Sequence, residues 1–113
     1  MPTRLKVCCI ESEDEARLAV ALGASALGLV SAMPSGPGVI GEDRIASIAG
    51  RVPPGVATFL LTSATSVEEI VAQQRRCRTS TVQVCDRLRE GGHAELKDRL
   101  PGVKIVQVVH VVD

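Results

Sequence analysis

The stretch Val56-Ala57-Thr58-Phe59-Leu60-Leu61 decides the fold class, because Thr58 is its only polar residue. A strand with one face in solvent alternates polar and apolar residues, whereas a strand covered on both faces is apolar nearly throughout and is usually parallel to its neighbours. Parallel neighbours need a long crossover connection, which is usually a helix. The stretch therefore predicts an α/β protein built on a parallel sheet.

Four more short apolar runs flank this one, so the sheet is predicted to hold five strands. Their expected ranges are residues 5–10, 26–30, 81–85 and 103–112. Residues 31–41 are rich in Pro and Gly and are expected to form a loop. Each crossover between parallel strands is expected to be right-handed.

Amphipathic stretches between the strands predict four helices. Ser12 with Glu15, and Ser66 with Glu69, form the capping-box pattern that starts a helix. The fourth helix is expected at residues 93–99, because Pro101 stops it. The expected core-facing residues are Leu18, Ala21 and Leu22 in the first helix, Ile45, Ile48 and Ala49 in the second, and Val67, Ile70 and Val71 in the third.

Two architectures fit this alternation of strands and helices. One is an open flavodoxin-like sheet with strand order 2-1-3-4-5. The other is part of a (β/α)8 TIM barrel, about the first four βα units plus a fifth strand, in the order 1-2-3-4-5. Periodicity does not choose between them. No linker or composition shift divides the chain, so residues 1–113 are expected to form a single domain.

Composition excludes several classes of function. Thirteen basic and thirteen acidic residues cancel, and the chain has no Trp, no Tyr and one Phe, which argues against a nucleic-acid or membrane partner. No nucleotide-phosphate motif and no membrane span is present, and residues 1–10 do not form a signal peptide. Four cysteines without a C-x-x-C spacing predict free thiols in the cytoplasm rather than disulfides or a zinc site.

Cys8 is the candidate reactive residue. It ends the first predicted strand, the end at which parallel α/β proteins place their sites. Strand periodicity puts Lys6, Cys8 and Ile10 on one face, and both the lysine and the following helix N-terminus favour a thiolate. Burial would favour the thiol instead, and a small buried hydrophobic residue is the competing interpretation of Cys8.

Five segments of the chain match a known family in order and cover nearly all of it. They are Lys6-Val7-Cys8-Cys9-Ile10, Gly23-Ala24-Ser25-Ala26-Leu27-Gly28-Leu29-Val30, residues 56–63, Val82-Gln83-Val84-Cys85-Asp86, and Leu100-Pro101-Gly102-Val103-Lys104-Ile105. These segments resemble the phosphoribosylanthranilate isomerase family, which begins with a K-I/V-C-G-I/L strand, continues with an A-G-A-D-A-L-G-F-V/I strand and has a V-Q-L-H-G fourth strand.

The resemblance implies a TIM barrel of tryptophan biosynthesis that carries out an Amadori rearrangement of N-(5'-phosphoribosyl)anthranilate, with neither a metal nor an organic cofactor. An acid opens the ribose ring, and a base then removes the C2' proton from the resulting Schiff base. The resemblance places the base on Cys8. The expected substrate-binding residues are Gln83, in the matched fourth-strand segment, and Ser35, Gly36 and Gly38, in a loop whose backbone N–H groups can face an anion; the alternative for this loop is a flexible connection.

The chain also departs from the family pattern. The general acid at the end of the sixth strand and the phosphate-binding loops of strands seven and eight have no counterpart, and Asp113 does not match the acid. The loop after the second strand lacks the arginine that holds the anthranilate carboxylate. Cys9 and Cys85 replace a glycine and a histidine.

These departures predict a fragment that is inactive alone and that pairs with a missing C-terminal half-barrel or with itself. The alternative is a non-catalytic binding or scaffold module, either flavodoxin-like or a degenerate barrel.

Overall fold

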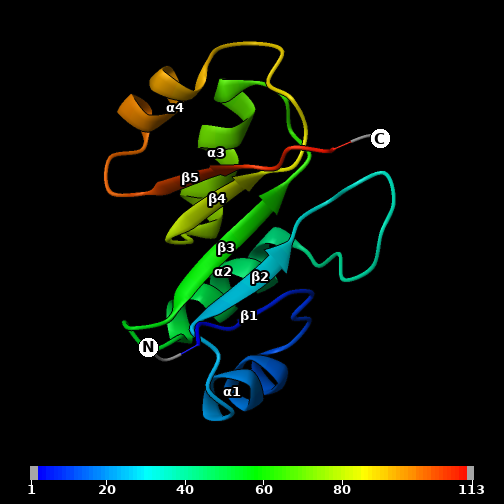
Figure 1. The fold of residues 1–113 in the computed structure, drawn as a ribbon, viewed down its shortest axis with the longest axis vertical. Coiled ribbons are helices and arrows are strands. Elements are labelled where there is room, and N and C mark those ends of the chain that lie inside the picture. Colours follow the sequence, from blue (N-terminus) through cyan, green and yellow to red (C-terminus); the bar gives the residue numbers. More distant parts are fainter. Residues whose placement is uncertain (1–2, 112–113) are drawn as a thin grey trace.

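The computed structural model describes residues 3–111, in which five strands and four helices alternate (Figure 1). The elements are β1 (Lys6–Val7), α1 (Glu13–Ala21), β2 (Ala26–Val30), α2 (Glu42–Arg51), β3 (Ala57–Thr62), α3 (Val67–Cys77), β4 (Thr81–Val84), α4 (His93–Arg99) and β5 (Lys104–Gln107). The Val112 end of the predicted fifth strand, Met1 and Asp113 lie outside the described residues. Among the described helices, none is long and apolar enough to cross a membrane.

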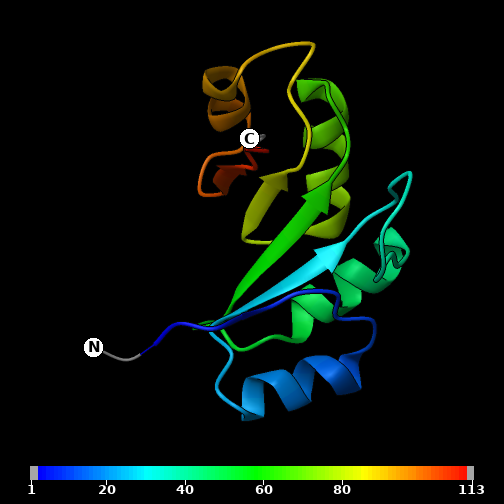
Figure 2. The ribbon, with the colours of Figure 1, turned by 45° about the vertical axis from the view of Figure 1, so that its right-hand side comes forward.

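The strands form one parallel sheet in the order β1-β2-β3-β4-β5. Each strand therefore pairs only with the strands next to it in the sequence. This sequential order is that of a (β/α)8 barrel and excludes the flavodoxin-like order 2-1-3-4-5. The helices cover one face of the sheet, as Figure 2 shows, because right-handed crossovers in one direction always return on the same side.

The core lies between the helices and the covered face of the sheet. Leu27, Leu29 and Leu60 point from the strands into this layer and are fully buried. Helix residues complete it, including the predicted core residues Ile45, Ile48, Val67, Ile70 and Val71. Burial of these side chains removes apolar surface from water, which is the main favourable contribution to folding.

The opposite face of the sheet is covered by no element of the described chain. Residues paired in register share a face, so this face is made by the inward positions of each strand. We call these residues the open face: Lys6, Ala26, Gly28, Val30, Ala57, Phe59, Leu61, Thr81, Gln83, Lys104 and Val106. Phe59, Leu61 and Gln83 are only half-buried. The prediction that strands such as residues 56–61 are covered on both faces is therefore wrong for the described chain. The inner face of a barrel is covered by the strands opposite, and the described chain holds only five strands.

β1 is much shorter than the predicted strand at residues 5–10. Cys9 adopts a left-handed backbone with φ 61°, which breaks the extended conformation. Ile10 is consequently only 4% exposed in the core, whereas Cys8 is exposed. The prediction that Ile10 shares a face with Cys8 is wrong for this reason.

β5 also ends early, at Gln107 rather than at residue 112. Its neighbour β4 stops at Val84, and Val108 N–H makes the last strand-like contact, 2.9 Å from the Val84 carbonyl oxygen. Val109 and Val111 follow this contact, and their side chains are exposed.

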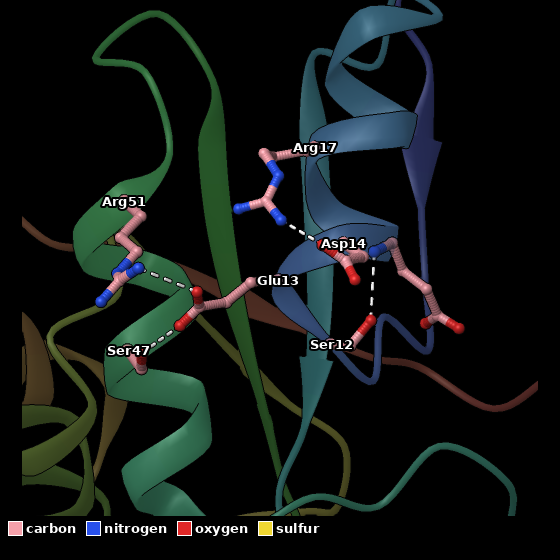
Figure 3. Close-up of polar contacts among 7 residues, drawn as sticks. Ser12, Glu13, Asp14, Arg17, Ser47 and Arg51 are labelled. Carbon is pink, nitrogen blue, oxygen red and sulfur yellow. Dashed lines mark hydrogen bonds and ion pairs between the residues drawn. The ribbon is translucent and has the colours of Figure 1, made fainter.

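The helix starts follow their predicted caps. The Ser12 and Ser66 hydroxyl groups accept hydrogen bonds from Glu15 N–H and Glu69 N–H, at 3.1 and 3.2 Å. Figure 3 shows the first cap and the contact of α1 with α2, in which Glu13 accepts hydrogen bonds from Ser47 and Arg51.

The predicted apolar stripe of α1 is wrong. Leu18 and Leu22 are 60% and 74% exposed, and Ala21 is exposed too. Ala16 instead points into the core, with Ala19 and Val20 packed beside it. The leucines face the side of α1 away from α2, which no element of the described chain covers.

Candidate functional site

Cys8 directly follows β1 (Lys6–Val7). β1 is an edge strand of the sheet (Figure 1). A Cβ on Gly28 would lie 2.9 Å from the Cys8 sulfur, so this sulfur occupies space on the open face that a side chain at position 28 would fill. Cys8 is exposed, and the competing interpretation of a buried hydrophobic residue is therefore wrong. The sulfur is accessible to a ligand at the rim of the open face.

Lys6 lies two residues before Cys8 and crosses the open face. Its Nζ donates a hydrogen bond of 2.5 Å to Gln83 Oε1 on β4. The same ammonium group lies 4.2 Å from the centroid of the Phe59 ring on β3, in a cation–π arrangement. Lys6, Phe59 and Gln83 thus form one polar cluster from three different strands, and it includes the predicted binding residue Gln83.

Cys85 directly follows β4 and lies within electrostatic reach of Cys8 and Lys6. Burial raises the pKa of the Cys85 thiol, and the charges of Asp86 and Cys8 raise it further, whereas Thr62 and Lys6 lower it. Burial disfavours the charged thiolate, so Cys85 stays a neutral thiol at neutral pH. Cys85 is also only partly accessible, whereas Cys8 is exposed.

The loop between β2 and α2 contains the other predicted binding residues. Gly38 lies against Cys9, because a Cβ at position 38 would be 2.7 Å from the Cys9 Cβ. The Cys9 thiol is 3.7 Å from the Pro37 carbonyl oxygen. Ser35 and Gly36 are exposed. The structure thus brings Gly38 next to the Cys8–Cys9 pair, whereas Ser35 and Gly36 stand in the exposed part of the loop.

The left-handed backbone at Cys9 gives a physical reason for the glycine of the family pattern at this position. Glycine adopts positive φ without steric cost, whereas other residues pay about 1–2 kcal/mol there. The chain must turn here to bring Ile10 into the core. Cys9 therefore carries strain directly beside the candidate base.

The four thiols all lie within the described residues, and none forms a disulfide. Residues 3–111 contain no group of three or more His, Cys, Asp or Glu side chains that could hold a metal ion.

We expect iodoacetamide at about pH 8 to modify Cys8 fastest and Cys77 slowest. Cys77 is fully buried, and burial raises its thiol pKa to about 11, with the Glu42 charge adding to the effect. Only the thiolate reacts, so the rate at Cys77 should be at most about one hundredth of the rate at Cys8. Peptide mass spectrometry of a quenched time course measures both rates. Similar rates at Cys8 and Cys77 in the folded chain, without added urea, would contradict this assignment.

Sequence reasoning missed two residues near the site. Phe59 was assigned only to a strand, and its contact with Lys6 depends on the register of β1, β2 and β3. His110 Nε2 lies 3.1 Å from the Cys85 carbonyl oxygen, in a segment that was predicted as strand. The alternation of side chains along β3 could have indicated the face on which Phe59 lies, but no local signal indicates the partner of His110.

Comparison with known proteins gives a consistent result. The chain is 27% identical over 109 residues to an N-(5'-phosphoribosyl)anthranilate isomerase of Methanocella arvoryzae, covering 96% of this chain and 51% of the relative. It is 31% identical over 99 residues to the isomerase of Haloarcula marismortui, covering 87% of this chain and 46% of the relative. No protein-family model matches the chain.

Solved structures agree on the fold. A phosphoribosylanthranilate isomerase in complex with reduced 1-(o-carboxyphenylamino)-1-deoxyribulose 5-phosphate superposes with a TM-score of 0.79 at 22% identity, over 99% of this chain and 56% of that one. The Pyrococcus furiosus enzyme gives a TM-score of 0.79 at 21% identity, over 98% and 53% of the two chains.

The five parallel strands thus match about half of a TIM barrel, and the chain spans about half the length of the relatives. On this basis the chain is a homologue of the N-terminal portion of the phosphoribosylanthranilate isomerase family.

Proposed function

We propose that this chain supplies the N-terminal half of a phosphoribosylanthranilate isomerase active site in the cytoplasm. Cys8 is the general base of the Amadori rearrangement in tryptophan biosynthesis. The observation that carries the proposal is the exposed Cys8 sulfur at the carboxyl rim of a sequentially ordered half-barrel. The relatives' names give the substrate, N-(5'-phosphoribosyl)anthranilate.

In this proposal the Cys8 thiolate takes the C2' proton of the Schiff base, and the electron pair left on C2' forms the enolamine. A sulfur base is suited to this step because its pKa can be brought near the working pH by its surroundings. The 31–41 loop, with Ser35, Gly36 and Gly38, lines the substrate beside Cys8, and Gln83 contacts it from β4. No residue of the described open face is a carboxylic acid, so the acid for ring opening comes from the complementary half.

Turnover of N-(5'-phosphoribosyl)anthranilate tests the proposal. We expect no measurable isomerisation by the purified chain, because neither the acid nor the phosphate site is present. We expect turnover when the chain is mixed with the C-terminal half of the Methanocella arvoryzae isomerase. The loss of substrate fluorescence measures the rate.

Each half assayed alone is the control. Turnover by this chain alone would contradict the division of the site between two halves. A stable complex without any turnover would contradict the catalytic proposal and favour the scaffold alternative.

A further inference from the structure

The open face carries an unbalanced positive charge. Lys6 and Lys104 both occupy inward strand positions, in register with Ala26 and Thr81. Among the open-face residues of the described chain there is no aspartate or glutamate. Any polypeptide that covers this face therefore meets two cations and no compensating anion.

The Lys6 ammonium group is only partly satisfied in the chain as described. It has three N–H donors, and the neutral Gln83 amide oxygen accepts one of them. The Phe59 ring adds a weaker attraction. Of the ion pairs between residues 3–111, none includes Lys6. The group is tolerated because the face is still open to water and Lys6 is only half-buried.

Covering the face would remove this water. A buried ammonium group without an opposite charge is strongly disfavoured, whereas a paired and hydrogen-bonded one is tolerated. The covering polypeptide must therefore bring an anionic side chain to the level of Lys6.

A second copy of this chain does not meet this requirement. Its own open face would bring two more lysines and no carboxylate into the same interface, and like charges repel when they are desolvated. The composition of the face thus favours a partner with a different sequence.

The edge of the sheet next to β1 shows where such a partner would begin. An apolar groove beside β1 and α1 is lined by Leu5, Val7, Leu18, Ala19 and Leu22. Leu18 and Leu22 are large exposed apolar side chains. In a parallel α/β sheet, the next strand pairs with the edge strand and its helix packs beside the neighbouring helix. The groove therefore has the position and the apolar surface that another strand–helix unit needs.

We infer that the open face and the groove bind a half-barrel polypeptide of a different sequence, which places a carboxylate against Lys6. The inference rests on the proposed completion of the barrel, but not on catalysis by Cys8. It adds one requirement to the partner, an inward-facing Asp or Glu, and one residue to the interface, Lys6.

Binding of the C-terminal half of the Methanocella arvoryzae isomerase, measured by isothermal titration without substrate, tests the inference. We expect a one-to-one complex with the unmodified chain. Lys6→Met leaves the partner's carboxylate buried and unpaired, and Lys6→Glu adds repulsion, so both should weaken binding about 100-fold or more. Lys97→Glu, on the exposed surface of α4, makes the same charge change away from the face and should change affinity by less than about threefold.

Each outcome decides the question. Equal affinity of the unmodified chain and Lys6→Met would overturn the inference, as would the absence of binding or a homodimer in sedimentation runs. Lys6→Met keeps an apolar stem of similar length, so it decides the test if Lys6→Glu does not fold. A Lys6-dependent complex without turnover would overturn the catalytic proposal alone.

Discussion

Replacing Cys8 by alanine in the complex of the two halves is expected to lower kcat by about 10²–10⁴-fold, the usual contribution of a general base. The Cys8 Sγ lies on the open face beside Gly28. When it is removed, no other base of the described chain occupies the space that it leaves. KM should change little, because the proton is transferred only in the transition state. Steady-state rates with N-(5'-phosphoribosyl)anthranilate measure both constants.

Cys9→Gly is the matched control for this variant. It removes the neighbouring thiol and installs the residue that the left-handed backbone favours, φ 61°. Its kcat is expected within about threefold of the unmodified complex, because the change leaves Cys8 in place. A Cys8→Ala complex that keeps full kcat would show that another group is the base.

Gly38→Ala is expected to lower the free energy of unfolding by about 2–4 kcal/mol, the sum of a positive-φ cost and an overpacking cost. Gly38 has φ 85°, and a Cβ there would lie 2.7 Å from the Cys9 Cβ and 3.0 Å from the Cys9 Cα. The backbone atom cannot move aside as a flexible side chain could. Urea denaturation of the purified chain measures the change.

A double-mutant cycle separates the two costs. Cys9→Gly removes the Cβ and Sγ that a side chain at position 38 would meet, so it should recover about 1–3 kcal/mol of the loss, the overpacking part. Gly36→Ala is the control, because Gly36 also has a positive φ of 111° but nothing lies within 4 Å of the added Cβ. Cys9→Gly should not rescue Gly36→Ala. Equal rescue of both variants would show that the contact between Gly38 and Cys9 has no energetic role.

Much of the fold could be predicted because its signals are local. The caps at Ser12 and Ser66 and the full range of α4 depend on residues within one turn of each helix end. The parallel sheet followed from the apolar character of residues 56–61. Predicting the strand order required the family resemblance, because periodicity alone fits two topologies.

The errors have a different physical origin. Leu18 and Leu22 form the apolar stripe that periodicity predicts, but no element of the described chain packs against it, so both leucines are exposed. β1 ends early because of one backbone conformation, at Cys9, which apolar patterning does not encode.

The candidate site was predictable only in part. Cys8 was singled out because its position at a strand end is a sequence signal; the structure shows it exposed, and its role as a base stays a prediction. The contact of Lys6 with Gln83 spans 77 residues of sequence and three strand pairings, so it follows from register and not from any motif. The roles of Ser35, Gly36, Gly38 and Gln83 in substrate binding stay predictions.

Because strands pair only with their neighbours in the sequence, each new strand of the sheet needs only the strand made just before it. Each pairing closes a connection of only one helix and its flanking loops, which costs less loop-closure entropy than a pairing of strands distant in sequence would. A nascent chain leaving the ribosome can therefore add β2 to β1, then β3, β4 and β5, in the order of translation. In the proposed complex the partner half-barrel covers the open face, and until it binds, this apolar surface is a target for chaperones and a cause of aggregation.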